Sequence, residues 1–166
     1  MRLIATRRNS FESRLIQWGT DSDSSHFAGV FYESSVPIVM QSNFLGVDFQ
    51  SAKMFFQKSV VVHEVKFDLT QAEEDEIFDS IVKTMVGEEY DWGAFAYFAK
   101  CGFMHKVFNC DWPTENKWAR SDRALCVEMA KSFPDKIVPP RIKELDLSMI
   151  YPTELIRMIA TEKWRP

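Results

Sequence analysis

The chain has 166 residues, 46% of them hydrophobic and 14% aromatic, and a formal net charge of −4. This length and composition support one sizeable core, so we expect residues 1–166 to form a single domain. The acidic balance argues against a nucleic-acid binder, which needs a basic face to neutralise phosphates. The three cysteines, Cys101, Cys110 and Cys126, have no CxxC spacing, which argues against a disulfide framework and a structural zinc site.

Residues 1–8 become charged after only a few apolar positions, and no later apolar run is long enough to span a bilayer. We therefore expect no signal peptide and no transmembrane segment. A cytoplasmic or phage-associated protein fits this pattern. The sequence does not indicate an oligomeric state.

The first half of the chain reads mainly as strands. Residues 2–6 predict a short strand, followed by a helix that begins near Asn9 or Ser10 and carries Phe11, Leu15 and Trp18 on one apolar face. Residues 27–32 and 36–40 predict a hairpin. Residues 60–67 are β-branched and predict a strand with Val61, His63, Val65 and Phe67 on one face.

The second half reads mainly as helices. Thr70-Gln-Ala-Glu73 matches a capping box and begins a helix that ends near Gly87. Residues 91–100 and 121–133 predict two more helices, separated by an irregular aromatic segment at 102–117. A last helix begins near Pro152, a residue suited to a first turn. The predicted class is therefore α+β, with a mainly antiparallel sheet flanked by helices.

Two residues suggest a nucleophile and its base. Cys126 follows the polar segment 121–123, which looks like a helix start, and His26 opens a predicted strand. A thiol needs a base to become a nucleophile. A helix N-terminus and a neighbouring imidazolium lower the pKa of a thiol, so we expect Cys126 to be a thiolate at neutral pH.

A series of motifs along nearly the whole chain resembles the circularly permuted NlpC-type papain-like amidases, whose relatives include lecithin–retinol acyltransferase-like enzymes. In chain order the matching segments are Leu3-Ile4, Ser10 to Trp18, Ser25-His26-Phe-Ala-Gly-Val, Met40-Gln41 with Gly46-Val47, Tyr90-Asp91-Trp92, Trp118, Leu125-Cys126-Val127-Glu128, and Tyr151-Pro152-Thr-Glu-Leu155. In this family the histidine strand precedes the cysteine helix, the reverse of papain.

The resemblance implies a permuted papain-like fold in which Cys126 is the nucleophile and His26 the general base. The third polar position falls on Gln41, whose amide can orient the imidazole without adding charge. The family usually carries His or Glu there, and Ser in place of Val127 after the nucleophile. A neutral Gln41 should polarise the Cys–His pair less than a carboxylate would, and Val127 and Gln41 together favour a non-catalytic member of the family.

Three alternatives remain beside this reading. His63 is a rival third catalytic member or base, although a partly buried structural histidine is the simpler interpretation. His105, Cys110 and Asp111 are conceivable metal ligands with undiagnostic spacing. The aromatic residues Phe103, Phe108, Trp112 and Trp118 are candidates for the wall of a substrate cleft.

The predicted function is a cysteine hydrolase that cleaves an amide bond through a thioester, with no metal or organic cofactor. The resemblance implies a peptide or acyl substrate, with cell-wall (peptidoglycan) peptides first. The alternatives are a lipid acyltransferase or phospholipase of the same superfamily, and a non-catalytic binding or virion-assembly module that keeps the fold.

Overall fold

The structure is a computed structural model that describes residues 1–33 and 36–163. The strands are β1 (Arg2–Arg8), β2 (His26–Glu33), β3 (Val36–Asn43), β4 (Gly46–Ser51), β5 (Ser59–Lys66), β6 (Glu89–Tyr90) and β7 (Arg123–Ala124). The helices are α1 (Phe11–Thr20), α2 (Ala52–Phe56), α3 (Gln71–Met85), α4 (Trp92–Phe108), α5 (Pro140–Lys143) and α6 (Pro152–Lys163), with two 3-10 helices, η1 (Glu128–Ser132) and η2 (Leu147–Met149).

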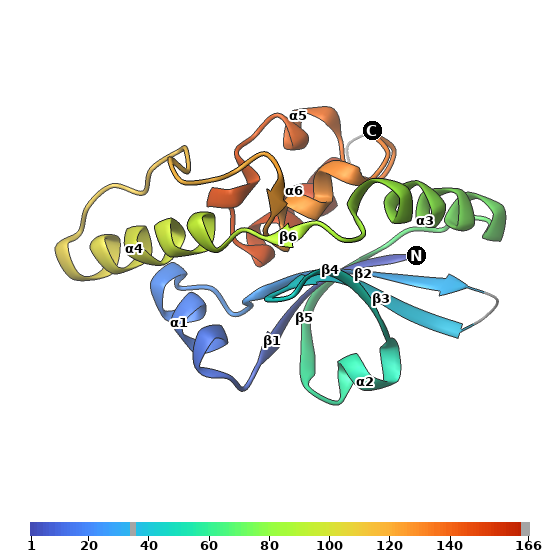
Figure 1. The fold of residues 1–166 in the computed structure, drawn as a ribbon, viewed down its shortest axis with the longest axis horizontal. Helices are drawn as coiled ribbons and strands as arrows, with labels where there is room; N and C mark the ends of the chain where they lie inside the picture. Colours follow the sequence, from blue (N-terminus) through green and yellow to red (C-terminus); the bar gives the residue numbers. More distant parts are fainter. Residues whose placement is uncertain (34–35, 164–166) are drawn as a thin grey trace.

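The main sheet has the strand order β4-β3-β2-β1-β5, and each neighbouring pair is antiparallel. The short strands β6 and β7 form a separate parallel pair. Helices flank the main sheet on both faces (Figure 1). The predicted α+β class with a mainly antiparallel sheet is therefore confirmed.

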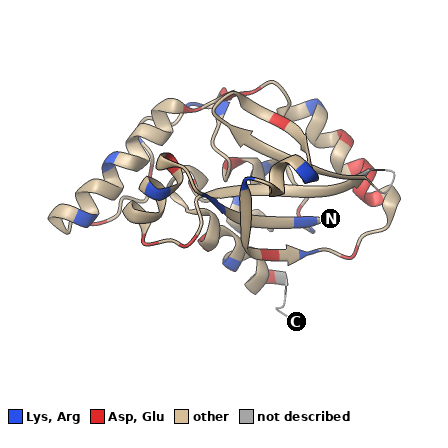
Figure 2. Ribbon diagram, turned by 90° about the horizontal axis from the view of Figure 1, so that it is seen from below, with Lys and Arg blue, Asp and Glu red and all other residues tan. Residues whose placement is uncertain are grey.

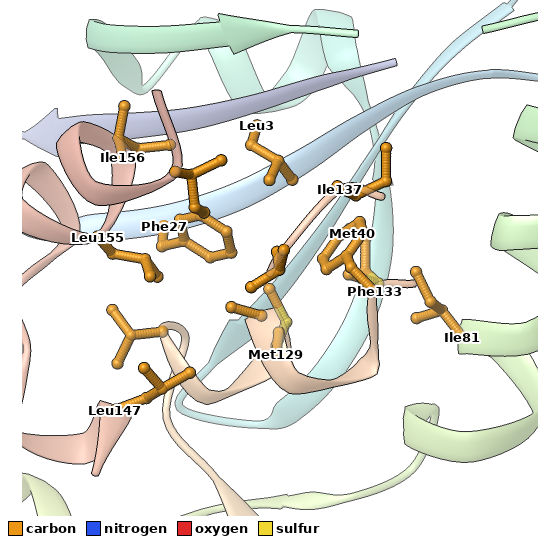
Figure 3. Close-up of a cluster of buried hydrophobic side chains, with 14 of the residues drawn as sticks. Leu3, Phe27, Met40, Ile81, Met129, Phe133, Ile137, Leu147, Leu155 and Ile156 are labelled. Atoms are coloured by element: carbon orange, nitrogen blue, oxygen red, sulfur yellow. The ribbon is translucent and has the colours of Figure 1, made fainter. Parts of the chain in front are cut away.

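The alternation of side chains along the strands divides the core between the two faces of the sheet. The larger cluster contains Leu3, Phe27 and Met40, which pack against residues of α3, η1 and α6 (Figure 3). The smaller cluster, on the other face, contains Ile4, Ala28 and Val39 together with Phe55 of α2. Strand β1 contributes to both clusters, as expected for a strand buried between two neighbours.

Strand β5 departs from the predicted alternation. Its pairing with β1 shifts between Ala5, which faces His63, and Thr6, which faces Val61. This bulge leaves one extra residue on β5 and reverses the faces of the residues on either side of it. Val65 therefore belongs to the larger core and Val61 packs against the smaller one, so the prediction that they share a face was wrong.

Helix α1 begins where expected, with Ser10 as its N-cap. Its predicted apolar face is not buried: Phe11, Leu15 and Trp18 are all exposed. The helix instead packs against α4 at two glycines, since a Cβ atom added at Gly102 would lie 3.2 Å from the Gly19 backbone. Glycine at both positions favours this close crossing, which buries a different side of α1.

The helices of the second half match the sequence in part. The capping box at Thr70 is present and α3 ends before Gly87, which has φ +91, so these predictions are confirmed. Asp91 caps α4, but α4 continues to Phe108 through a segment expected to be irregular. The prediction of a helix at 121–133 was wrong, because that segment forms β7, a turn and η1.

Lys and Arg residues are interspersed with Asp and Glu over the ribbon (Figure 2). Among residues 1–33 and 36–163, no helix combines the length and apolar character needed to cross a membrane. Helix α6 begins at Pro152, as predicted, and packs on β1 and β5.

Candidate active site

A cleft lies where β1 ends, β2 begins and β3 ends, since antiparallel pairing brings these strand ends to one edge of the sheet. Its volume is about 120 Å³, and Arg8, His26 and Cys126 all line it. The fold thus brings the predicted nucleophile and the predicted base, which are far apart in sequence, to the same cavity. Both side chains keep some solvent-accessible surface there, while protein atoms surround them on most sides.

The remaining walls of the cleft are largely apolar. They come from α1, the β3–β4 turn, the first turns of α4 and the segments around η1 and η2, and include Ile16, Phe44, Tyr90, Phe95, Phe98, Leu125, Val127, Ile150 and Pro152. A few serines and Glu12 supply polar positions. Such a cavity has the mixture typical of small-molecule sites, with apolar walls around a few convergent polar groups.

Gln41 connects the predicted base to Arg8. Nε2 of His26 lies 3.1 Å from Oε1 of Gln41, and Nη2 of Arg8 donates to the same atom over 3.0 Å. A guanidinium only donates, so the atom that it contacts must be the amide oxygen. That oxygen can only accept, so Nε2 of His26 carries the proton. Nδ1 is then the unprotonated nitrogen, which is the one able to act as a base.

Other contacts fix this chain of side chains in place. Nε of Arg8 donates to Oγ of Ser59 over 2.9 Å, and its guanidinium lies 5.2 Å from the ring centroid of Phe55. The amide nitrogen of Gln41 donates to Gln50 over 3.3 Å. Gln41 is 3% exposed. A buried amide with its donors and acceptors satisfied does not rotate freely, so the tautomer of His26 is set by the surrounding structure.

Cys126 lies in a turn that leads into η1, not at the start of an α-helix as predicted. The backbone N–H of Leu125 donates to Oε2 of Glu128 over 2.9 Å, and the N–H of Glu128 donates to the carbonyl of Leu125 over 3.0 Å. These reciprocal bonds close the turn around the cysteine. The predicted α-helix does not form here because the Glu128 side chain bonds to the backbone of Leu125 and stabilises a tight turn in its place.

The thiol faces three backbone N–H groups, from Phe27, Val127 and Cys126 itself. Burial nevertheless dominates and raises the pKa of Cys126 to about 11, although these N–H groups oppose the rise. Burial, and then the charge of Arg8, lower the pKa of His26 to about 4, while the bond to Gln41 acts in the opposite direction. The resting pair is therefore neutral thiol and neutral imidazole, and the expected thiolate at neutral pH is not found.

His63, the rival third member, is not part of the cleft. Its Nε2 lies 2.8 Å from Oδ2 of Asp23, whose Oδ1 accepts a hydrogen bond from Thr153 over 2.6 Å. This network joins the loop after α1 to β5 and α6. Among the two candidates for the third position, Gln41 is the one that contacts His26.

Two possibilities that the sequence left open are not seen. None of the candidates Phe103, Phe108, Trp112 and Trp118 lines the cleft, because α4 continues through this region and carries Phe103 and Phe108 away from it. His105, Cys110 and Asp111, which the sequence did not favour as metal ligands, do not form a cluster: Nδ1 of His105 is 2.8 Å from the carbonyl oxygen of Cys110. Within the residues that the structure describes, no group of three His, Cys, Asp or Glu side chains is placed to hold a metal ion.

Sequence reasoning missed Arg8 as a functional residue. It was seen only as part of a short basic pair, Arg7-Arg8, and nothing in its sequence neighbours marks it. The signal that was available is the strand period: Ile4, Thr6 and Arg8 alternate onto one face of β1, where a charged residue at the strand end lies beside His26 of the next strand. Phe44 was likewise missed, since turn residues carry no periodic signal.

No family model and no curated protein matches the chain. Among solved structures, it is similar to the crystal structure of metalloprotein yiiX from Escherichia coli O157:H7, DUF1105, with a TM-score of 0.54 and 21% sequence identity. The alignment covers 98% of this chain and 80% of that chain. At this identity the likeness concerns the fold, a mixed α and β arrangement around an antiparallel sheet.

Proposed function

We propose that the protein is a cysteine hydrolase with a permuted papain-like fold, which cleaves amide bonds through a thioester on Cys126. The observation that carries the proposal is the arrangement of the cleft. Cys126 and His26 line one cavity, and the bonds from Arg8 through Gln41 leave Nδ1 of His26 as the free base. The order of the histidine strand before the cysteine turn supports the permuted topology.

The neutral resting pair defines the first step of the mechanism. As Sγ of Cys126 attacks the substrate carbonyl carbon, Nδ1 of His26 takes the thiol proton, so charge separation develops only during attack. The tetrahedral oxyanion would be stabilised by backbone N–H groups of the turn at Cys126 and Val127. The positive charge of Arg8 favours the negatively charged oxyanion, while burial and then this charge hold the pKa of His26 low.

The second step releases the leaving group. The imidazolium of His26 returns its proton to the amine nitrogen, the carbon–nitrogen bond breaks, and the acyl group remains on sulfur as a thioester. His26 then takes a proton from water, hydroxide adds to the thioester carbonyl, and Cys126 leaves as a thiol after proton return. The products are a carboxylic acid and an amine, and one water is consumed.

Two substrate classes are candidates. The family resemblance favours an amide in a cell-wall peptide. The apolar walls of the cleft, with Ile16, Phe95 and Phe98, favour a second candidate, the acyl group of a lipid. Both reactions pass through the same thioester.

The experiment that tests the proposal is direct detection of the thioester. The protein is mixed with a panel of muropeptides, N-acyl amides and glycerolipids, quenched with acid, and analysed by peptide mass spectrometry. We expect one acyl group on Cys126. In Cys126→Ser the acyl group should form an oxygen ester, which hydrolyses more slowly than the thioester. A Cys101→Ser/Cys110→Ser double variant should acylate normally. Hydrolysis that survives in Cys126→Ala would contradict the assignment, and no acylation by any substrate would favour the non-catalytic binding or virion-assembly module.

A further inference from the structure

Helices α1 and α4 expose a contiguous apolar surface, which we call the α1/α4 face. Its large side chains are Phe11, Leu15, Trp18, Phe103, Val107 and Phe108, and Phe11 alone is 77% exposed. The rings of Trp18 and Phe103 are 6.4 Å apart, and those of Phe103 and Phe108 are 6.1 Å apart. The residues therefore adjoin one another across the helix pair. Contiguous exposed aromatic surface of this kind marks an interaction site more often than scattered apolar residues do.

Basic side chains border this face. With about 100° per helical residue, Lys100 and Lys106 project roughly 60° to either side of Phe103 on α4. On α1, Arg14 borders the row of Phe11, Leu15 and Trp18 on one side and Glu12 borders it on the other. Lys106 is paired with Asp21, and Lys100 lies 5.4 Å from the ring centroid of Trp118. The sequence of α4 contains no Asp or Glu, although the chain as a whole has a net charge of −4.

The α1/α4 face adjoins the candidate active site. A small groove between the helices is lined by Leu15, Trp18, Ala99 and Gly102, among others. Three of its lining residues, Ile16, Phe95 and Phe98, also line the cleft that holds Cys126. The groove and the cleft are therefore neighbours that share these apolar side chains.

We propose that the α1/α4 face docks on an anionic lipid surface. An aromatic centre with lysines at its margins matches a bilayer interface, where apolar rings enter the acyl boundary and cations reach the head groups. The acid-free helix α4, with Lys100 and Lys106 on either side of Phe103, favours an anionic occupant over a protein surface of mixed charge. Docking in this way would place the cleft that holds Cys126 next to the bilayer. The use of that position for acyl transfer alone rests on the proposed cysteine chemistry.

The test is co-sedimentation of the Cys126→Ala protein with phosphatidylglycerol/phosphatidylcholine vesicles and with phosphatidylcholine vesicles alone. We expect binding to the anionic vesicles and at least a tenfold loss in the Phe11→Asp/Phe103→Asp variant, because two rings leave the acyl boundary. Lys100→Gln should weaken binding about fivefold. The matched control is Val36→Asp at the start of β3, which is 59% exposed at the end of the sheet far from α1 and α4 (Figure 1) and should bind like the parent.

Three outcomes would overturn the proposal: no binding to anionic vesicles, equal loss in the Val36→Asp control, or a dimer in sedimentation velocity that Phe103→Asp dissociates. The dimer would identify the face as a contact between two copies. Because the parent already lacks the nucleophile, the result is independent of hydrolysis. An enzyme that is acylated on Cys126 but ignores vesicles would contradict only the docking.

Discussion

Two histidines lie on opposite sides of β1, in strands β2 and β5, and their surroundings differ in charge. His26 is paired with Thr6 and bonds to the neutral amide of Gln41, whereas His63 is paired with Ala5 and bonds to the carboxylate of Asp23. A carboxylate partner stabilises a charged ring and makes a structural contact. A neutral partner whose oxygen is fixed by Arg8 instead selects one tautomer, while burial and then the charge of Arg8 lower the pKa of the ring and keep it uncharged. The comparison teaches that the partner of a histidine indicates its role better than its place on a strand does.

The largest expected effect is the loss of the base. His26→Ala should lower kcat/KM about 10³-fold, because the group assigned to take the thiol proton during attack is lost. His63→Ala should change kcat/KM by less than about twofold, because its contacts lie outside the cleft. Both variants are assayed with the substrate that acylates Cys126. Similar losses in the two variants would remove the distinction drawn between the two histidines.

How far the sequence predicts the site can be judged from particular residues. Cys126, His26 and Gln41 were selected from the order of motifs, and the structure places Cys126 and His26 on one cleft with Gln41 bonded to His26. The apolar runs at 27–32 and 36–40 predicted β2 and β3, and the capping box predicted the start of α3, because these signals depend on residues close together in the chain.

The features that the sequence did not predict depend on contacts between distant residues. The protonation of Cys126 follows from burial among segments that only folding brings together, so local helix arguments gave the wrong charge state. The exposed face of α1 follows from the crossing of Gly19 and Gly102, which no periodicity in α1 reveals. The bulge opposite Ala5 and Thr6 reversed part of β5, because it depends on the pairing with β1.

The pH dependence of stability measures the surroundings of His26 directly. Its pKa is about 4 in the folded protein, below the value near 6.5 in the unfolded chain. Between these values the unfolded chain binds more protons, so the free energy of unfolding falls as the pH decreases from about 6.5 to 4. We expect a contribution of about 2–3 kcal/mol to this fall. Urea denaturation at several pH values should show this contribution in wild type and not in His26→Gln. If the free energy of unfolding depends on pH in the same way in both proteins, His26 is not held neutral.

Removing the donor that fixes Gln41 should have a smaller effect. In Arg8→Met the amide can turn its NH2 group toward Nε2 of His26, which favours the unproductive tautomer. We expect kcat to fall 10- to 100-fold, on the order of the cost of a misplaced catalytic group. The 15N chemical shifts of His26 should change from Nε2-protonated to a mixture. Arg8→Lys should restore part of both, and the exposed neighbour Arg7→Met serves as the matched control. A lower kcat with an unchanged tautomer would show that Arg8 acts only through its charge.

The smallest expected effect concerns the second histidine. Although burial raises it, the hydrogen bonds from Thr153 and His63 together hold the pKa of Asp23 below its usual value. Asp23→Asn weakens both contacts at a partly exposed position, so the free energy of unfolding should fall by about 1 kcal/mol at pH 7. Thermal and urea unfolding measure this change. The rate of acylation of Cys126 should stay within about twofold, because the Asp23 network joins secondary-structure elements without touching the cleft. A large loss of acylation in a well-folded Asp23→Asn protein would mean that the two histidines belong to one coupled site.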